Sequence, residues 1–235
     1  MAEILGTAAN DLLVGTAEND NVFGLEGNDT LNGSLGDDTL FGNQGIDFFQ
    51  EAAGNDTIFG GKDGDLIVDT QGNNQIFGNL GDDLIFGGVG NDLIYGGQDN
   101  DNLSGDVGDD FLSGDKGDDL LVGVSFASAN PGRGELDTLS GGAGIDVFAL
   151  GDATRTYYLG TGLNDVALLI DFAPAEDLIA VSTTNNLSIS AFSLAGIGEG
   201  TGIFSSGDLI AFAPGIGADQ ITIGVNVFPV PIPNT

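Results

Sequence analysis

Aspartate recurs at a fixed interval of nine residues along the first half of the chain. Counted in units of nine from Gly6 to Val122, thirteen units follow one another without a gap. Position six is Asp in twelve of them and Asn74 in the remaining one. The twelve are Asp11, Asp20, Asp29, Asp38, Asp47, Asp56, Asp65, Asp83, Asp92, Asp101, Asp110 and Asp119. Rows of carboxylates offer oxygen ligands, which suit hard cations such as calcium or magnesium.

The composition removes most other chemistries. The 235-residue chain contains no Cys and no His, which excludes disulfides, thiolate or imidazole zinc sites and a Ser-His-Asp triad. The net charge of -32 argues against nucleic acid and anionic membranes as partners, because like charges repel. No apolar run is long enough for membrane insertion, and residues 1–6 do not resemble a cleavable secretory signal. No catalytic signature is evident, so we do not expect an enzyme.

The other positions of the unit predict the elements that hold these carboxylates. Position one is Gly in eleven units, the exceptions being Glu51 and Asp69, and position four is usually Gly. Such glycine-rich stretches of six residues predict tight turns. Position eight is always a large apolar residue, and the last three residues predict a short strand with position eight inward and its neighbours outward. Stacked copies would form a parallel sheet with a continuous inner stripe.

Several units resemble the calcium-binding nonapeptides of the RTX family, the repeats-in-toxin or hemolysin-type proteins. Examples are Gly-Gly-Val-Gly-Asn-Asp-Leu-Ile-Tyr at residues 87–95 and Gly-Gly-Ala-Gly-Ile-Asp-Val-Phe-Ala at residues 141–149. The resemblance covers residues 6–149. It implies an all-β fold, a parallel β-roll or calcium-stabilised β-solenoid with two units per coil. Several calcium ions would lie between stacked turns, held by position-six carboxylates and turn carbonyls.

Two units per coil would place every second turn on the same edge of the roll. One edge would carry Asp11, Asp29, Asp47, Asp65, Asp83, Asp101, Asp119 and Asp137, and the other Asp20, Asp38, Asp56, Asn74, Asp92, Asp110 and, after a gap, Asp146. Carboxylates about 4.8 Å apart repel one another unless cations lie between them. Turn propensity alone would place Asp in each turn, but not twelve times at one position. We predict all fourteen Asp as calcium ligands, with sites beside Asn74 lacking one charge.

The period divides the chain into two predicted regions. Residues 1–149 would form the roll, with a loop at residues 123–131 where the register breaks, and residues 150–235 a β-rich cap. Short β-like runs in the cap are 166–170, 177–181, 208–212 and 220–223. The cap resembles the closing region of secreted RTX proteins, which carries an uncleaved C-terminal signal for type 1 secretion.

Position nine differs between alternate units. Those that would share one face carry Phe23, Phe41, Phe59, Phe77 and Tyr95. Such a row pointing outward would expose roughly 400–600 Å², at the upper end for the largest apolar patch of a monomer. We expect a contact surface covered by a second copy of the chain, by residues 150–235 or by another partner, with self-association as the first choice.

The resemblance implies a secreted bacterial protein, extracellular or on the cell surface, that folds on binding calcium outside the cell and has a structural role. The alternative is a secretion or accessory module of a type 1-secreted enzyme or toxin whose catalytic part is absent. A solenoid that binds ice or glycan is disfavoured, because outward Thr is confined to Thr30, Thr39, Thr57 and Thr138, without a ladder.

Overall fold

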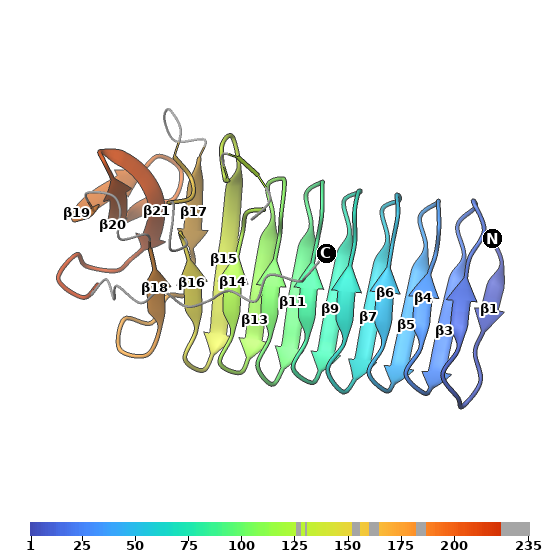
Figure 1. Cartoon of the computed structure of the whole chain (residues 1–235). Coiled ribbons are helices and arrows are strands. Elements are labelled where there is room, and N and C mark those ends of the chain that lie inside the picture. Colours follow the sequence, from blue (N-terminus) through green and yellow to red (C-terminus); the bar gives the residue numbers. More distant parts are fainter. Residues whose placement is uncertain (126–127, 130, 152–155, 160–164, 182–186, 222–235) are drawn as a thin grey trace.

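The strands of the chain stack into an elongated solenoid (Figure 1). A computed structural model describes residues 1–235 except 126–127, 130, 152–155, 160–164, 182–186 and 222–235. The regular structure of the described residues is entirely β-strand, which confirms the predicted all-β class. Among these residues there is no helix of the length and apolarity needed to cross a membrane.

The described strands form two sheets, of twelve and nine strands. The larger sheet contains, in spatial order, β1 (Glu3–Leu5), β3 (Asn21–Glu26), β5 (Thr39–Gln44), β7 (Thr57–Lys62), β9 (Gln75–Leu80), β11 (Leu93–Gln98), β13 (Phe111–Lys116), β15 (Leu136–Ala143), β17 (Val166–Leu169), β21 (Asp208–Pro214), β20 (Gly198–Ser205) and β19 (Leu187–Leu194). The smaller sheet contains β18 (Leu178–Ala180), β16 (Val147–Ala149), β14 (Leu120–Val122), β12 (Asn102–Ser104), β10 (Leu84–Phe86), β8 (Leu66–Val68), β6 (Phe48–Gln50), β4 (Thr30–Asn32) and β2 (Leu12–Val14).

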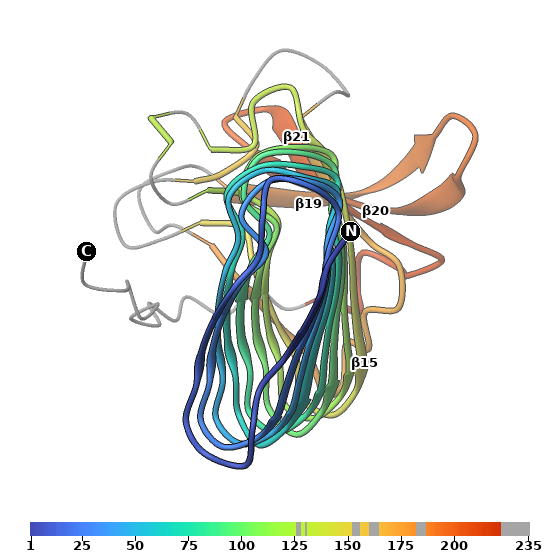
Figure 2. The same ribbon diagram turned by 90° about the vertical axis from the view of Figure 1, so that its right-hand side faces the viewer.

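Position eight of each unit forms the core between the two sheets. Each strand of the repeat pairs in parallel with the strand one coil later, so that Ile58 lies beside Ile76 in the larger sheet and Ile67 beside Ile85 in the smaller one. These four side chains are completely buried. Viewed along the solenoid, the coils of the backbone lie one behind another (Figure 2). The predicted β-roll and its inward-facing positions are confirmed.

Strands of the larger sheet are longer than the sequence predicts. β5, for example, covers six residues where three were expected, because backbone pairing continues into the glycine-rich part of the unit. Leu25 pairs with Asn43, and Asn43 pairs with Gly61. Leu25 and Asn43 have φ of 80° and 74°, so position two bends the chain without ending the ladder. Asn enters this left-handed region more readily than Leu, so Leu25 makes its turn more hindered.

The loop after β14 changes which edge the next two Asp residues occupy. Thr138 pairs with Phe111, which lies three units earlier in the chain, whereas partners in the regular coils are two units apart. Asp137 therefore follows Asp110, and Asp146 follows Asp119, so the predicted edge assignment of Asp137 and Asp146 is wrong. The physical reason is that the described residues of the 123–131 segment form no strand. This segment has the length of one unit but adds no half-coil to the roll, so the units after it lie on the opposite edges from those predicted. Residues 126, 127 and 130 lie outside the described residues.

The cap continues both sheets before it closes the roll. β17 pairs in parallel with β15 and β18 with β16, after which β19, β20 and β21 form an antiparallel end (Figure 1). β17, β18 and β21 confirm three predicted strands. In the fourth, 220–223, residues 220 and 221 form no strand, and residues 222 and 223 lie outside the described residues. The hairpin of β19 and β20 was not predicted, because its second strand begins with the glycine-rich run Gly198–Thr201. Since both sheets cross residue 149, the division there stays a prediction.

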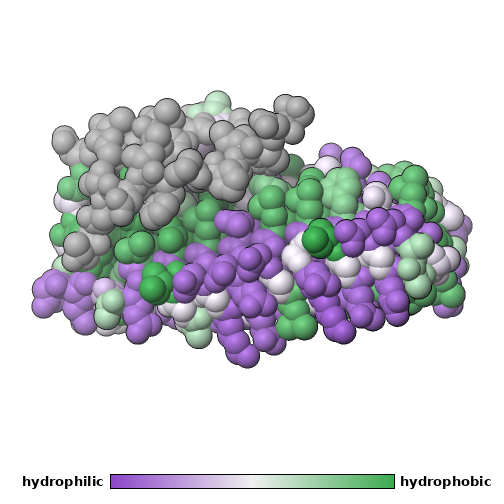
Figure 3. Space-filling view, turned by 60° about the horizontal axis from the view of Figure 1, so that its bottom comes forward, coloured by the Kyte–Doolittle hydropathy of each residue, from purple (hydrophilic) through white to green (hydrophobic). Residues whose placement is uncertain are grey.

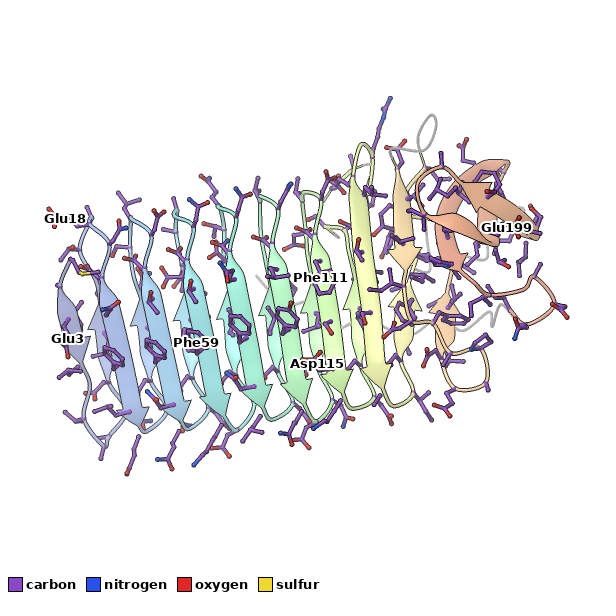
Figure 4. All side chains as sticks on the ribbon, turned by 180° about the vertical axis from the view of Figure 1, so that it is seen from behind. Glu3, Glu18, Phe59, Phe111, Asp115 and Glu199 are labelled. Atoms are coloured by element: carbon purple, nitrogen blue, oxygen red, sulfur yellow. The ribbon has the colours of Figure 1, made fainter. Side chains whose placement is uncertain are left out.

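The aromatic row lies on the outer face of the larger sheet. Its ring centroids are 4.9 Å apart between Phe23 and Phe41 and 5.4 Å apart between Phe77 and Tyr95, with nearly parallel planes. Phe111, at position seven of the next strand, tilts against Tyr95 at the end of the row, where position nine is Ser113 (Figure 4). Stacking leaves each ring half-buried. A different surface in Figure 3 presents a band of hydrophilic residues along much of the molecule.

We predict that the chain self-associates through this row, and that replacing three of its rings prevents the association without unfolding the roll. The triple variant Phe41→Ser, Phe59→Ser, Phe77→Ser should sediment as a monomer in calcium and bind less hydrophobic dye than the parent, because these side chains point away from the core. Phe86→Ser, on the outer face of the smaller sheet, is the control and should behave like the parent. Identical sedimentation and dye binding of parent and triple variant would refute a contact surface here.

Candidate metal centre

Each position-six Asp lies where a turn passes into a strand. Asp29 directly precedes β4, and its carbonyl oxygen accepts the backbone N–H of Phe48 in the next coil at 2.9 Å. The strand pairing therefore fixes the backbone on both edges of the roll. It also buries these acidic side chains, of which Asp29 is 2% and Asp83 1% exposed.

One carboxylate oxygen of every repeat Asp after Asp11 joins successive coils. The backbone N–H of Asp65 donates to Oδ1 of Asp83 at 2.7 Å, and the N–H of Asp83 donates to Oδ1 of Asp101 at 2.8 Å. The same bond continues along the other edge, where Oδ1 of Asn74 accepts from the N–H of Asp56 at 2.8 Å. Position six therefore forms a hydrogen-bonded ladder along each edge.

The second oxygen, Oδ2, has no such partner in most of the ladder. It is buried and lacks a hydrogen-bond partner among the described residues in Asp29, Asp38, Asp47, Asp56, Asp65, Asp83, Asp92, Asp101, Asp110, Asp119 and Asp146. An ionised oxygen removed from water is strongly destabilising unless it is paired or coordinates a metal. Eleven repetitions of the same buried, unpaired oxygen therefore fit a cation as its partner.

Glycine at position one creates the space into which Oδ2 points. A Cβ atom on Gly24 would lie 2.5 Å from Oδ2 of Asp29 and 2.8 Å from the carbonyl oxygen of Gly42 in the next coil. We call this space, bounded by the two oxygens, the oxygen cradle. No three acidic side chains of the described residues are grouped as a metal site. The atoms that bound the cradle are one carboxylate oxygen and one main-chain carbonyl oxygen. Calcium prefers such mixtures of carboxylate and carbonyl oxygen, so the residues present fit it.

The sequence comparison decides which family this geometry belongs to. The profile of the "RTX calcium-binding nonapeptide repeat (4 copies)" matches residues 5–40, 14–49, 32–67, 59–94, 68–103, 95–125 and 132–154, well over half of the chain. The chain belongs to the RTX calcium-binding repeat family. It is a calcium-binding β-roll protein.

Structural comparison finds similarity between this RTX chain and the AlgE6R3 subunit of the mannuronan C5-epimerase from Azotobacter vinelandii. The TM-score is 0.26 and the identity 16%, over 98% of this chain and 91% of the subunit. A comparison with curated proteins gives no match.

Burial makes the ionised form of the RTX carboxyls unfavourable when no cation is bound. It raises the pKa of Asp65 and of Asp101 to about 8, and that of Asp110 to about 9, with further contributions from neighbouring carboxylates. Backbone N–H donors oppose the shift but do not cancel it. A divalent cation in the cradle would reverse this balance by favouring the ionised form.

Three of the fourteen predicted ligands have different surroundings. Oδ2 of Asp11 and of Asp20 accepts the backbone N–H and the hydroxyl of Thr7 and Thr16, respectively. Oδ2 of Asp137 accepts the hydroxyl of the fully buried Tyr158 at 2.6 Å. In Asp11 and Asp20 at the start of the roll, and in Asp137 beside the loop, the oxygen that would face a cation thus already accepts hydrogen bonds from the protein. The assignment of all fourteen residues as ligands stays a prediction.

The sequence did not predict two acidic residues that bond to the edge of the roll. Oδ1 of Asp177 accepts the N–H of Asp146 at 3.1 Å, which extends the position-six ladder into the cap. Asp171 accepts the backbone N–H groups of residues 141 and 142 and the hydroxyl of Ser140. Asp177 could have been recognised because it precedes Leu-Ile, as the Asp of several repeats does. It lies beyond the residues that follow the period of nine, so the period did not identify it.

We predict that acid partly replaces calcium in folding the RTX roll. The raised pKa values mean that the calcium-free fold binds protons more strongly than the unfolded chain, whose Asp pKa is about 4. The stabilisation is full below about pH 4 and is lost as the pH rises through the folded values of about 6 to 9. In buffer stripped of calcium, circular dichroism should show more β structure at pH 5 than at pH 9. In saturating calcium the signal should not change, and an equal lack of change without calcium would contradict the prediction.

Proposed function

We propose that calcium binding folds this protein outside the bacterial cell, where it has a structural or surface role and no catalytic one. The observation that carries the proposal is the repeated Oδ2 atom that is buried without a partner. In the absence of a cation, folding must bury these charges or protonate them. With a cation between successive turns, the same atoms become ligands, so binding and folding are a single event.

The charge of the repeat region strengthens this coupling. Residues 1–149 contain 28 acidic and three basic side chains, so the chain repels itself when it becomes compact. The eleven Asp with a free Oδ2 are the proposed ligands with the strongest support, and several ions bind along both edges. Asp11, Asp20 and Asp137 would join them only where calcium displaces their present hydroxyl donors.

The proposed location follows from the calcium requirement. Extracellular modules bind calcium with dissociation constants of about 10⁻⁴–10⁻³ M, well above the range of cytosolic sensors. Such a chain would stay unfolded and exportable in the cell and would fold after secretion. We assign the roll to residues 1–149 and the cap to residues 150–235, with type 1 secretion as the route.

The first test is calcium-dependent folding at pH 8. Binding to the folded state alone stabilises it by roughly 4 kcal/mol at a thousandfold excess over the dissociation constant, and several sites add to this. On titration with calcium we expect a cooperative rise of the β signal in circular dichroism. The hydrodynamic radius from sedimentation velocity should decrease. Magnesium at equal concentration is the control and should produce less structure. Native β signal in excess chelator at this pH would overturn the proposal.

A further inference from the structure

Two acidic residues occupy position one, where the other units between residues 6 and 122 have glycine. Glu51 and Asp69 belong to units that are two apart, so they lie in adjacent coils on one edge. Their exposed fractions are 1% and 3%. Oε2 of Glu51 and Oδ2 of Asp69 have no hydrogen-bond partner within the described part of the chain. Each carboxyl group thus enters the region that glycine leaves open elsewhere.

The turn of Asp69 also lacks the usual acid at position six. Its position-six residue is Asn74, whose Oδ1 accepts the backbone N–H of Asp56 at 2.8 Å. This bond fixes the amide, so that Nδ2 takes the place of the free oxygen found in the other turns. An amide NH₂ group is a donor and cannot coordinate a cation. In turn 69–74 the Cβ of Asp69 occupies the place that glycine leaves open in the other turns, so the cradle here differs from the regular one. It would have no carboxylate ligand if position six were the sole source.

Asp69 places a carboxylate beside that cradle. Its Oδ1 accepts the N–H of Gln71 at 2.9 Å, which orients the side chain within its own turn and leaves Oδ2 free. The backbone N–H of Glu51 donates to the carbonyl oxygen of Val68, and the N–H of Asp69 donates to that of Phe86 in the next coil, both at 3.0 Å. Asp69 therefore lies between the two turns that flank turn 69–74. In the next turn the cradle is regular, since a Cβ on Gly87 would lie 2.5 Å from Oδ2 of Asp92.

We propose that Asp69 supplies the carboxylate ligand that Asn74 lacks, so that a calcium site persists between turns 69–74 and 87–92. The site takes a hard divalent cation through a position-one carboxylate and the main-chain carbonyls of the next coil. This inference rests on the proposed calcium-dependent folding. The proposal replaces the prediction that sites beside Asn74 lack one charge. Asp69, five residues before Asn74 in the same turn, supplies that charge.

Glu51 provides a matched comparison in the preceding coil. Its Oε1 accepts the backbone N–H of Gly33 at 2.6 Å, and that N–H is thereby taken from the strand ladder. In the regular coils this position-one N–H donates to a position-nine carbonyl, as Gly15 does to Asn32. Because the turn of Glu51 retains Asp56, its carboxylate is not needed to complete a site.

The test is to count bound calcium ions by equilibrium dialysis and native mass spectrometry of the full chain. Asp69→Asn keeps the side-chain shape and should bind one ion fewer, or bind its weakest ion at least tenfold less tightly. Glu51→Gln is the matched control and should bind as many ions as the parent. The double variant Asp69→Gly, Asn74→Asp rebuilds the regular unit and should restore the parent number.

Equal number and affinity of ions in Asp69→Asn and the parent would overturn the inference. If Asp69→Asn does not fold in calcium, the single variant Asp69→Gly decides, because it has the regular glycine and keeps Asn74; the parent number of ions in that variant would refute a ligand role for Asp69. A parent chain that binds no calcium would instead refute the proposed function itself. Calcium binding by the parent together with an unchanged Asp69→Asn would refute only the role of Asp69.

Discussion

The structure depends on a carboxylate that is buried with one oxygen bonded and the other free. Oδ1 of every repeat Asp after Asp11 joins one coil to the preceding coil, which fixes the side chain against the turn. Oδ2 then points into a space that exists because position one has no Cβ. The glycine, the Asp five residues later and the coil length of two units are thus requirements of one site. Changing any of them would alter the oxygens that face a cation.

Comparison of magnitudes explains why the roll needs this cation. Burying an Ile side chain, such as Ile67 or Ile85, contributes about 1.5–3 kcal/mol, and each unit supplies one inward residue. One pKa unit corresponds to about 1.4 kcal/mol. A carboxyl whose pKa is raised from 3.8 to about 8, as in Asp65, therefore opposes folding above that pH by roughly 6 kcal/mol, more than the contribution of its unit to the core. Each coil supplies two inward position-eight side chains, one from each sheet. Their burial cannot offset the cost of burying the carboxylates unless cations or protons are bound.

The sequence predicted the structural features that repeat along the chain, but not those that occur once. Period, inward positions and parallel stacking followed from the alternation of residues around positions such as Ile85. The edge of Asp137 was predicted wrongly, because nine loop residues have the length of a unit without forming its strand. The hydroxyl of Tyr158 on Asp137 and the ladder bond of Asp177 join segments 21 and 31 residues apart. No local pattern specifies contacts of that kind.

A crystal structure of the protein grown in calcium, with ions located by anomalous scattering, would test the central claim most directly. Our account predicts ions between successive turns on both edges, within about 2.3–2.6 Å of the free Oδ2 atoms and of position-one carbonyl oxygens. An ion beside Asp92 and none beside the hydroxyl-bonded Asp137 is the expected contrast within one edge. A folded roll whose Oδ2 atoms contact water or protein donors, with no ion between the turns, would contradict the account.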